Sequence, residues 1–271
     1  MKTIRLLFIG VLLIAVNVQA QKIYIRGGLG IAVSTAAYYT GDYNHSGSND
    51  IVTVKKQGIG TGLPFVLAAG YKLNKHFGFE LGIDYFYGFK MKTKSTSEYY
   101  TYETKYNGQM LSIVPAFVIS LPLDKVLPYA RLGLKLGVLN SLIMSEHKVN
   151  SYPEKATTSV TIDSKSKLYG GIAFGVQAAV GADFVLSDLI SLFGEIQVDG
   201  ISYAPSHGKY TEYTENGVDK LGSMTEKEKR WDYKKEVDYS KTIPDSDPDE
   251  DVKQNYPFGN VGLVIGVKVN L

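Results

Sequence analysis

The sequence predicts an all-β fold, namely an eight-stranded antiparallel up-and-down β-barrel. Three observations lead to this prediction: apolar residues alternate with small or charged ones, such segments occur eight times, and the connections between them alternate in length. The clearest segment runs from Phe77 to Met91, where every odd position is large and apolar and most even positions are glycine or charged. A period of two is that of an extended strand, since helical spacing would mix the two sets.

The eight segments follow one another along the whole chain after its first residues. They span about Lys22 to Tyr39, Gly58 to Leu73, Phe77 to Lys92, Gln109 to Leu121, Leu127 to Ser145, Lys167 to Leu186, Leu189 to Ala204 and Tyr256 to Leu271. Apolar residues at alternate positions mark the strands, as in Ile23, Ile25, Leu29, Ile31 and Val33; Leu132, Leu134, Leu136 and Val138; Ile172, Phe174 and Val176; Ile190, Leu192, Ile196 and Val198; and Leu263, Ile265, Val267 and Val269.

Long and short connections alternate strictly between these segments. The short ones are Asn74 to His76, Pro122 to Val126 and Ser187 to Asp188, and the long ones are Thr40 to Gln57, Thr93 to Gly108, Ser145 to Ser166 and Pro205 to Asn255. An up-and-down barrel has this layout, with tight turns and both termini at one end and long loops at the other.

Residues 1–20 are predicted to be a secretory signal peptide, and residues 21–271 a single barrel domain. Lys2 and Arg5 precede an apolar run of eleven residues, and Val18-Gln19-Ala20 offers a small-residue cleavage site. The run is shorter than the roughly 20 residues that a membrane-spanning helix needs. The chain has no cysteine, so we expect no disulfide framework, no thiolate metal site and no acylated cysteine.

Composition narrows the function classes. A net charge of +2 gives no reason to expect nucleic acid as a partner. The 20 tyrosines and 28 glycines fit a membrane barrel better than a compact enzyme. Membrane barrels confine their apolar band to alternate residues, so their average hydropathy resembles that of a soluble protein.

The face opposite the apolar one carries a balanced set of charges. Five acids and five bases lie there, and we predict that they form a charge network in the lumen: Arg26, Glu80, Asp84, Lys90, Arg131, Lys135, Asp183, Glu195, Asp199 and Lys268. An eight-stranded lumen is only wide enough for side chains, and buried charges are tolerated mainly when paired. A secreted soluble barrel with its apolar face inside would place the same charges in water, and alternation alone does not distinguish the two.

Energetics favour the arrangement with lipid outside. A lysine or arginine that faces lipid near the midplane costs about 2–4 kcal/mol, so a few misplaced ones would rival the stability of a whole domain. The length of the strands and the alternation of long and short connections also favour a membrane barrel over a soluble one. The sequence therefore predicts a transmembrane β-barrel with long extracellular loops.

The chain resembles the small outer-membrane barrels of Gram-negative bacteria, the group that includes the OmpA transmembrane domain, OmpX and OmpW-like proteins. The resemblance rests on the signal peptide ending in Gln19-Ala20, the eight alternating strands and the closing run from Asn260 to Leu271. It implies a location in the outer membrane and a final strand that serves as the assembly signal, although Leu271 stands where an aromatic residue is usual. No peptidoglycan-binding domain is expected after the eighth strand.

The resemblance implies several functions among which the residues discriminate in part. A charge-filled lumen argues against a wide pore, so we expect a lumen that does not conduct. We also expect a non-enzymatic surface protein without cofactors. Its expected partners are outer-membrane lipid, lipopolysaccharide and a surface or envelope protein that contacts the loops. The alternative is OmpW-like transport of small apolar molecules, or a narrow gated channel; the inward apolar residues Phe86, Phe193 and Val264 are few for an apolar pocket.

A lipid-modifying enzyme is the second alternative. It would need a nucleophile, a base and an orienting acid, and the first candidates are Ser206, His207 and Glu146 at the outer ends of strands. Their spacing does not match the His-x-Ser arrangement of the lipid-deacylating barrels. Loop polarity explains these residues more simply.

The last long loop raises a question of metal binding. Asp245 to Asp251 places carboxylates at alternate positions, as calcium loops do, but Glu250 stands where glycine is needed and Tyr256 where a bidentate glutamate is needed. Pro205 to Asn255 holds thirteen acids and nine bases, so we expect it to be too polar to pack a core by itself and to be mobile. The tyrosine-rich stretch Glu98 to Glu103 is either a contact surface or a strand extension.

Overall fold

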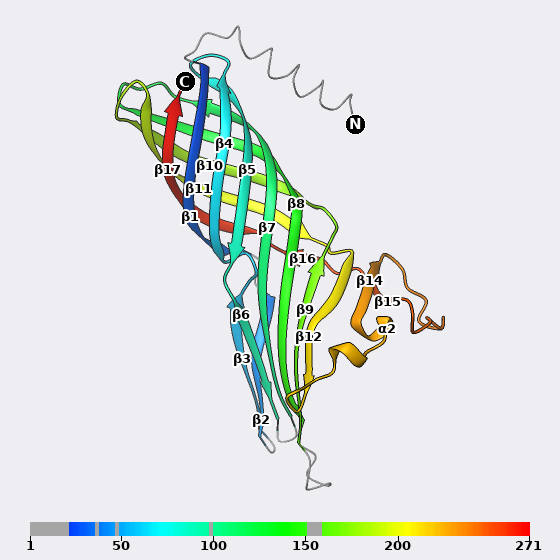
Figure 1. The fold of residues 1–271 in the computed structure, drawn as a ribbon. Coiled ribbons are helices and arrows are strands. Elements are labelled where there is room, and N and C mark those ends of the chain that lie inside the picture. Colours follow the sequence, from blue (N-terminus) through cyan, green and yellow to red (C-terminus); the bar gives the residue numbers. More distant parts are fainter. Residues whose placement is uncertain (1–21, 36–37, 47–48, 98–99, 151–158) are drawn as a thin grey trace, which may run out of the picture.

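Eight strands close into an antiparallel barrel (Figure 1). The computed structural model describes residues 22–35, 38–46, 49–97, 100–150 and 159–271. Around the ring, the strands are β1 (Ile23–Ser34), β4 (Gly62–Lys72), β5 (Phe77–Gly88), β7 (Tyr100–Ser120), β8 (Val126–Asn150), β10 (Ala173–Val185), β11 (Ile190–Tyr203) and β17 (Asn260–Asn270). All eight neighbouring pairs are antiparallel, and pairing of β17 with β1 closes the ring. The predicted fold class is confirmed.

The apolar face of the barrel points outward. On β8, Leu132 is 63% exposed whereas its neighbour Arg131 is only 5% exposed. On β5, Leu81 and Ile83 are exposed and Asp84 is buried. A soluble barrel needs the opposite arrangement, so the structure supports the predicted orientation. Among the described residues, no helix is both long and apolar enough to span a membrane.

The two ends of the barrel differ greatly in length. At one end, the turn end, short turns join the strands and the chain terminates (Figure 1). At the other, the loop end, β7 and β8 run on for 21 and 25 residues in total. They are joined there by β2 (Tyr38–Ser46), β3 (Asn49–Gln57), β6 (Met91–Thr96), β9 (Val160–Tyr169) and β12 (His207–Glu215).

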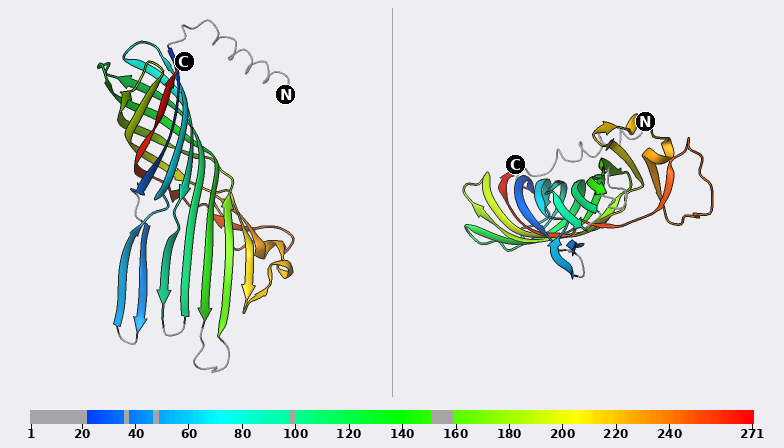
Figure 2. Two further views of the ribbon diagram at one scale, coloured as in Figure 1. Left: turned by 60° about the vertical axis from the view of Figure 1, so that its left-hand side comes forward. Right: turned by 90° about the horizontal axis from the view of Figure 1, so that it is seen from below.

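These strands form an open sheet beyond the barrel, which we call the outer sheet. With β14 (Arg230–Lys234) and β15 (Asp249–Val252) added at one edge, its order is β3-β2-β6-β7-β8-β9-β12-β14-β15, and it continues one side of the barrel wall without closing (Figure 2). The long connections predicted from the sequence are therefore built largely of paired strands. Beyond the membrane both sheet faces meet water, so hydrophobic alternation fades while backbone pairing continues. The tyrosine-rich stretch extends a strand, since β7 begins at Tyr100.

The segment after β12 packs onto the sheet instead of remaining free. It contains β13 (Val218–Asp219), η4 (Leu221–Ser223), α2 (Glu226–Lys229), β14 (Arg230–Lys234), β15 (Asp249–Val252) and β16 (Tyr256–Pro257), and it projects sideways in Figure 1. Trp231 and Tyr233 of β14 pack against the buried core. The segment was expected to be too polar to pack a core by itself, and it packs instead by adding two aromatic rings to a core formed mainly by the barrel strands.

Candidate functional site

A network of buried ion pairs fills the middle of the lumen. Glu195 accepts hydrogen bonds from Arg26 and Arg131, each at 2.7 Å, and from the Tyr129 hydroxyl at 2.8 Å. A second carboxylate, Glu80, lies 3.9 Å from Arg26 and 3.7 Å from Arg131. Four strands supply these groups, so the pairs connect opposite walls of the barrel.

The network continues toward the loop end through Lys135. Its ammonium group lies 2.6 Å from Asp199 and 3.4 Å from Asp84. Gln177 donates to Asp84 at 2.7 Å and accepts a hydrogen bond from Arg131 at 2.8 Å. This amide therefore joins the two groups of ion pairs into one network.

Toward the turn end the network ends at a further ion pair. Lys268 lies 2.5 Å from Asp183 and stacks over the Tyr24 ring at 4.1 Å from its centroid. The Tyr24 hydroxyl donates to Glu80 at 2.8 Å. Charged and hydrogen-bonded groups thus extend along the lumen from its turn end to the level of Asp199.

The structure brings nine of the ten predicted network residues together and leaves Lys90 outside. Lys90 is exposed, because β5 ends at Gly88 and the alternation that placed Lys90 inward ends with it. The lumen set is therefore five acids and four bases rather than five of each. Neutral donors also stabilise the lumen carboxylates, since Tyr24 donates to Glu80 and Gln177 donates to Asp84.

A buried apolar layer lies at the loop end of the lumen, and the sequence did not reveal it. We call it the apolar plug; its buried members come from all around the barrel: Ala32, Ile59, Phe86, Met110, Leu142, Leu168, Ala173, Ile201, Tyr203, Tyr256 and Phe258. The Phe258 ring lies 6.2 Å from both Phe86 and Tyr203. A Cβ at Gly108 would lie 2.6 Å from this ring, so the glycine is what admits it. Ile59 and Phe258 lie just outside strands, where strand alternation gives no signal.

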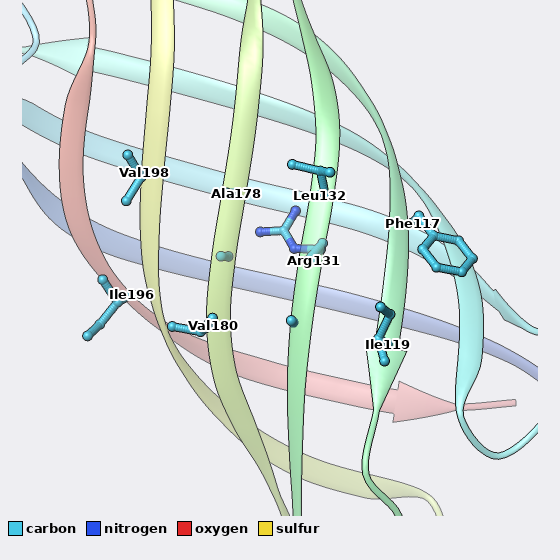
Figure 3. Close-up of a pocket in the computed structure, with 10 residues that line it drawn as sticks. Phe117, Ile119, Arg131, Leu132, Ala178, Val180, Ile196 and Val198 are labelled. Carbon is cyan, nitrogen blue, oxygen red and sulfur yellow. The ribbon is translucent and has the colours of Figure 1, made fainter.

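The outer surface carries a shallow apolar groove (Figure 3). It has a volume of about 320 Å³ and lies between β7, β8, β10 and β11. Ala178 is small beside Leu132, Val180 and Ile196, which leaves the depression in the surface. Its lining is almost wholly apolar, as expected where an acyl chain lies.

The structure does not assemble the three catalytic candidates. Within the described ranges no hydrogen bond joins Ser206, His207 and Glu146 to one another; His207 instead contacts Asp232 at 2.7 Å, and Glu146 accepts from Tyr102 at 2.5 Å. His207 pairs with the end of β9, which lies five residues along the sheet from the position of Glu146, or about 16 Å at the usual strand rise.

The acidic segment makes contacts of its own. Glu250 forms an ion pair with Lys234, and the Tyr239 hydroxyl lies 3.5 Å from Asp251. In the part of the chain that the structure describes, no three His, Cys, Asp or Glu side chains gather as a metal site would require.

One acidic group of the outer sheet is strongly perturbed. Glu103 on β7 lies 2.7 Å from Lys92 and 2.9 Å from Lys105. Hydrogen bonds from these two ammonium groups lower the pKa of Glu103 to about 2. Glu103 therefore keeps its charge well into acid.

Together these features define a class of protein, a strand barrel that crosses a bilayer with lipid outside and ion pairs inside. The chain matches the family described as outer membrane protein beta-barrel domain over residues 6–220. It therefore belongs to this family and lies in the bacterial outer membrane, as the sequence predicted. Outer-membrane barrels have short periplasmic turns and longer extracellular loops, so the turn end corresponds to the periplasmic side and the outer sheet to the extracellular side.

The chain was also compared with solved structures and with curated proteins. Among solved structures, the chain is similar to Ail, the attachment invasion locus protein of Yersinia pestis, with 11% identity and a TM-score of 0.34 over 92% of this chain and 95% of that chain. The comparison with curated proteins gave no match.

Proposed function

We propose that this protein is a non-enzymatic surface protein whose lumen does not conduct and whose outer sheet contacts a partner at the cell surface. The observation that carries the proposal is the double filling of the lumen. Ion pairs such as Arg131 with Glu195 occupy the membrane section, and the apolar plug around Phe258 occupies the extracellular end. A solute would have to displace both layers, and a packed hydrophobic constriction excludes ions and water.

The outer sheet supports the role in contact. Loops on a rigid scaffold commonly carry recognition, and here β7 and β8 pass without interruption from the barrel into the outer sheet. Trp231 and Tyr233 fix the β14 segment to the same scaffold. The surface is thus held in a defined shape, which lowers the entropic cost of binding.

The two halves of the proposal have separate tests. Purified protein in planar bilayers should give no stable channel openings, and large steady conductance would contradict the closed lumen. For recognition, intact protein and a version with residues 207–255 replaced by a short Gly/Ser linker are used to capture partners from native membranes. Heat-modifiable migration on gels shows that both barrels are folded. Capture of the same proteins by both versions would count against a recognition role for this part of the outer sheet.

A narrow gated channel is a second candidate, favoured by buried atoms in the described part of the lumen that lack a hydrogen-bond partner. Among the described residues, Arg26 Nε, Arg131 Nε, Glu80 Oε2 and Asp183 Oδ1 are buried without a hydrogen-bond partner. Buried polar atoms of this kind are commonly served by internal water. The membrane section would then be hydrated from the periplasm, and the apolar plug alone would be the gate. Removing Phe258 distinguishes this candidate from a fully blocked lumen.

A further inference from the structure

Three cations stand side by side on the outward face of the outer sheet. Lys167 on β9 is directly opposite Lys209 on β12, which is directly opposite Arg230 on β14. All three are exposed. We call them the cation row. Like charges directly opposite one another on neighbouring strands repel, so this row is unfavourable for the folded protein by itself.

The protein supplies little to neutralise the row. Within the described residues neither Lys167 nor Lys209 forms an ion pair; Lys209 instead lies over the Tyr169 ring, 5.6 Å from its centroid. Only Arg230 has a carboxylate partner, Glu226 at 3.4 Å. By contrast, Lys165 on the same face of β9 lies 3.0 Å from Glu212. Two of the three cations of the row, Lys167 and Lys209, therefore offer positive charge without a carboxylate partner in the described part of the chain to a ligand from outside it.

Its height above the membrane indicates which ligand. Lys167 is directly opposite Ile143 on β8, and four residues back along that strand lies Leu139, which is 69% exposed on the lipid-facing side. Four residues span about 13 Å, and a strand tilted by about 45° reduces this to roughly 9 Å of height. Tyr169 lies between the two levels, where amphipathic rings suit a membrane interface. The cation row thus stands at the level of lipid headgroups.

We propose that the cation row binds the phosphate groups of a phosphorylated glycolipid in the outer leaflet, of the lipopolysaccharide type. Three cations at interstrand spacing cover about 10 Å, which suits one or two phosphates. Arginine adds bidentate contacts to phosphate oxygens, and lysine a compact charge. The face that carries the row continues the lipid-facing surface of β8, so membrane lipid reaches it first. The inference rests on the outer-membrane location and does not depend on a closed lumen or on a protein partner.

The test compares glycolipid binding by a row variant and a matched control. Lys167, Lys209 and Arg230 are replaced by glutamine together in one variant; in the control, Lys148, Lys220 and Lys241, exposed bases elsewhere on the extracellular part, are replaced likewise. Each folded protein in detergent is titrated with lipopolysaccharide, with the same lipid after enzymatic dephosphorylation, and with heparin, and binding is followed by native mass spectrometry. Heat-modifiable migration shows that each variant is folded.

The expected result is a loss that is specific for the row and for phosphate. Each basic residue near an anionic surface contributes about fivefold in affinity, so the row variant should bind lipopolysaccharide about 100-fold more weakly, and the control within about twofold of the wild type. The dephosphorylated lipid should bind wild type as weakly as intact lipid binds the row variant. Equal losses in both variants, undiminished binding of the dephosphorylated lipid, or tighter binding of heparin than of lipopolysaccharide would each overturn the proposal.

Discussion

Replacing Glu195 with glutamine removes the central charge of the lumen network. This carboxylate accepts hydrogen bonds from Arg26, Arg131 and Tyr129, all within 2.8 Å. Its side chain is fully buried in the barrel interior. In the Glu195→Gln variant, two guanidinium groups would remain in the lumen, and Glu80, at 3.7 to 3.9 Å, would be the one carboxylate left beside them among the described residues.

The expected cost is large because the charges left behind cannot reach water. Removing one member of a buried ion pair typically costs about 3–5 kcal/mol, and the glutamine retains an acceptor oxygen, so we expect about 3 kcal/mol. The control is Glu212→Gln, which removes an exposed partner of Lys165 at 3.0 Å and should cost less than about 1 kcal/mol. The free energy of unfolding is measured for each variant by reversible urea unfolding in lipid vesicles.

The test compares the loss of unfolding free energy in Glu195→Gln with that in Glu212→Gln. A loss of about 3 kcal/mol corresponds to more than a hundredfold change in the folding equilibrium. If Glu195→Gln destabilises the barrel no more than Glu212→Gln does, the ion pairs of the lumen are not energetically coupled. The reasoning from burial would then be refuted.

Three further predictions concern the plug, the outlying lysine and the outer sheet. Phe258→Ala empties the centre of the apolar plug, so it should cost about 3–5 kcal/mol and produce measurable openings in planar bilayers if the plug is the gate; a silent variant would show that the network alone blocks the lumen. Lys90→Met should change the free energy of unfolding by less than about 0.5 kcal/mol, because Lys90 is exposed; a large loss would return it to the network. The folded-state pKa of Glu103 is depressed to about 2, so its contribution to the β6–β7 pairing is complete above its usual pKa of 4.5 and is lost as the pH falls from there through about 2. The protection factors of the β6–β7 amides, which correct for the intrinsic pH dependence of exchange, should fall over that range in the wild type and lose this pH dependence in Glu103→Gln.

The barrel could be predicted because residues that face lipid alternate along each strand with residues that face the lumen. Arg131 and Leu132 are neighbours in sequence, and only a strand with lipid on one side and a lumen on the other separates them as observed. The same rule failed at Lys90, two residues beyond the end of β5, because alternation has meaning only while the strand continues.

The alternation of apolar and polar residues could not predict the outer sheet or the apolar plug. Strands above the membrane have water on both sides, so their sequence need not alternate. Phe258 enters the lumen from outside a strand, beside Gly108, which lies 150 residues earlier in the chain. Contacts of this kind depend on closure of the barrel and leave no local pattern. The pairing of His207 with Asp232 likewise depends on the alignment of β12 with β14.

The central claim is that hydrocarbon surrounds the barrel while the charged lumen is sealed, and two adjacent alanines test it directly. Ala178 faces outward and Ala179 is buried inside. Because the chain has no cysteine, Ala178→Cys and Ala179→Cys each carry a single thiol of similar size. In lipid vesicles, a maleimide dissolved in the membrane should label Ala178→Cys, and neither this reagent nor a water-soluble one should label Ala179→Cys. Labelling of Ala179→Cys from the membrane, or of Ala178→Cys from water, would contradict the account.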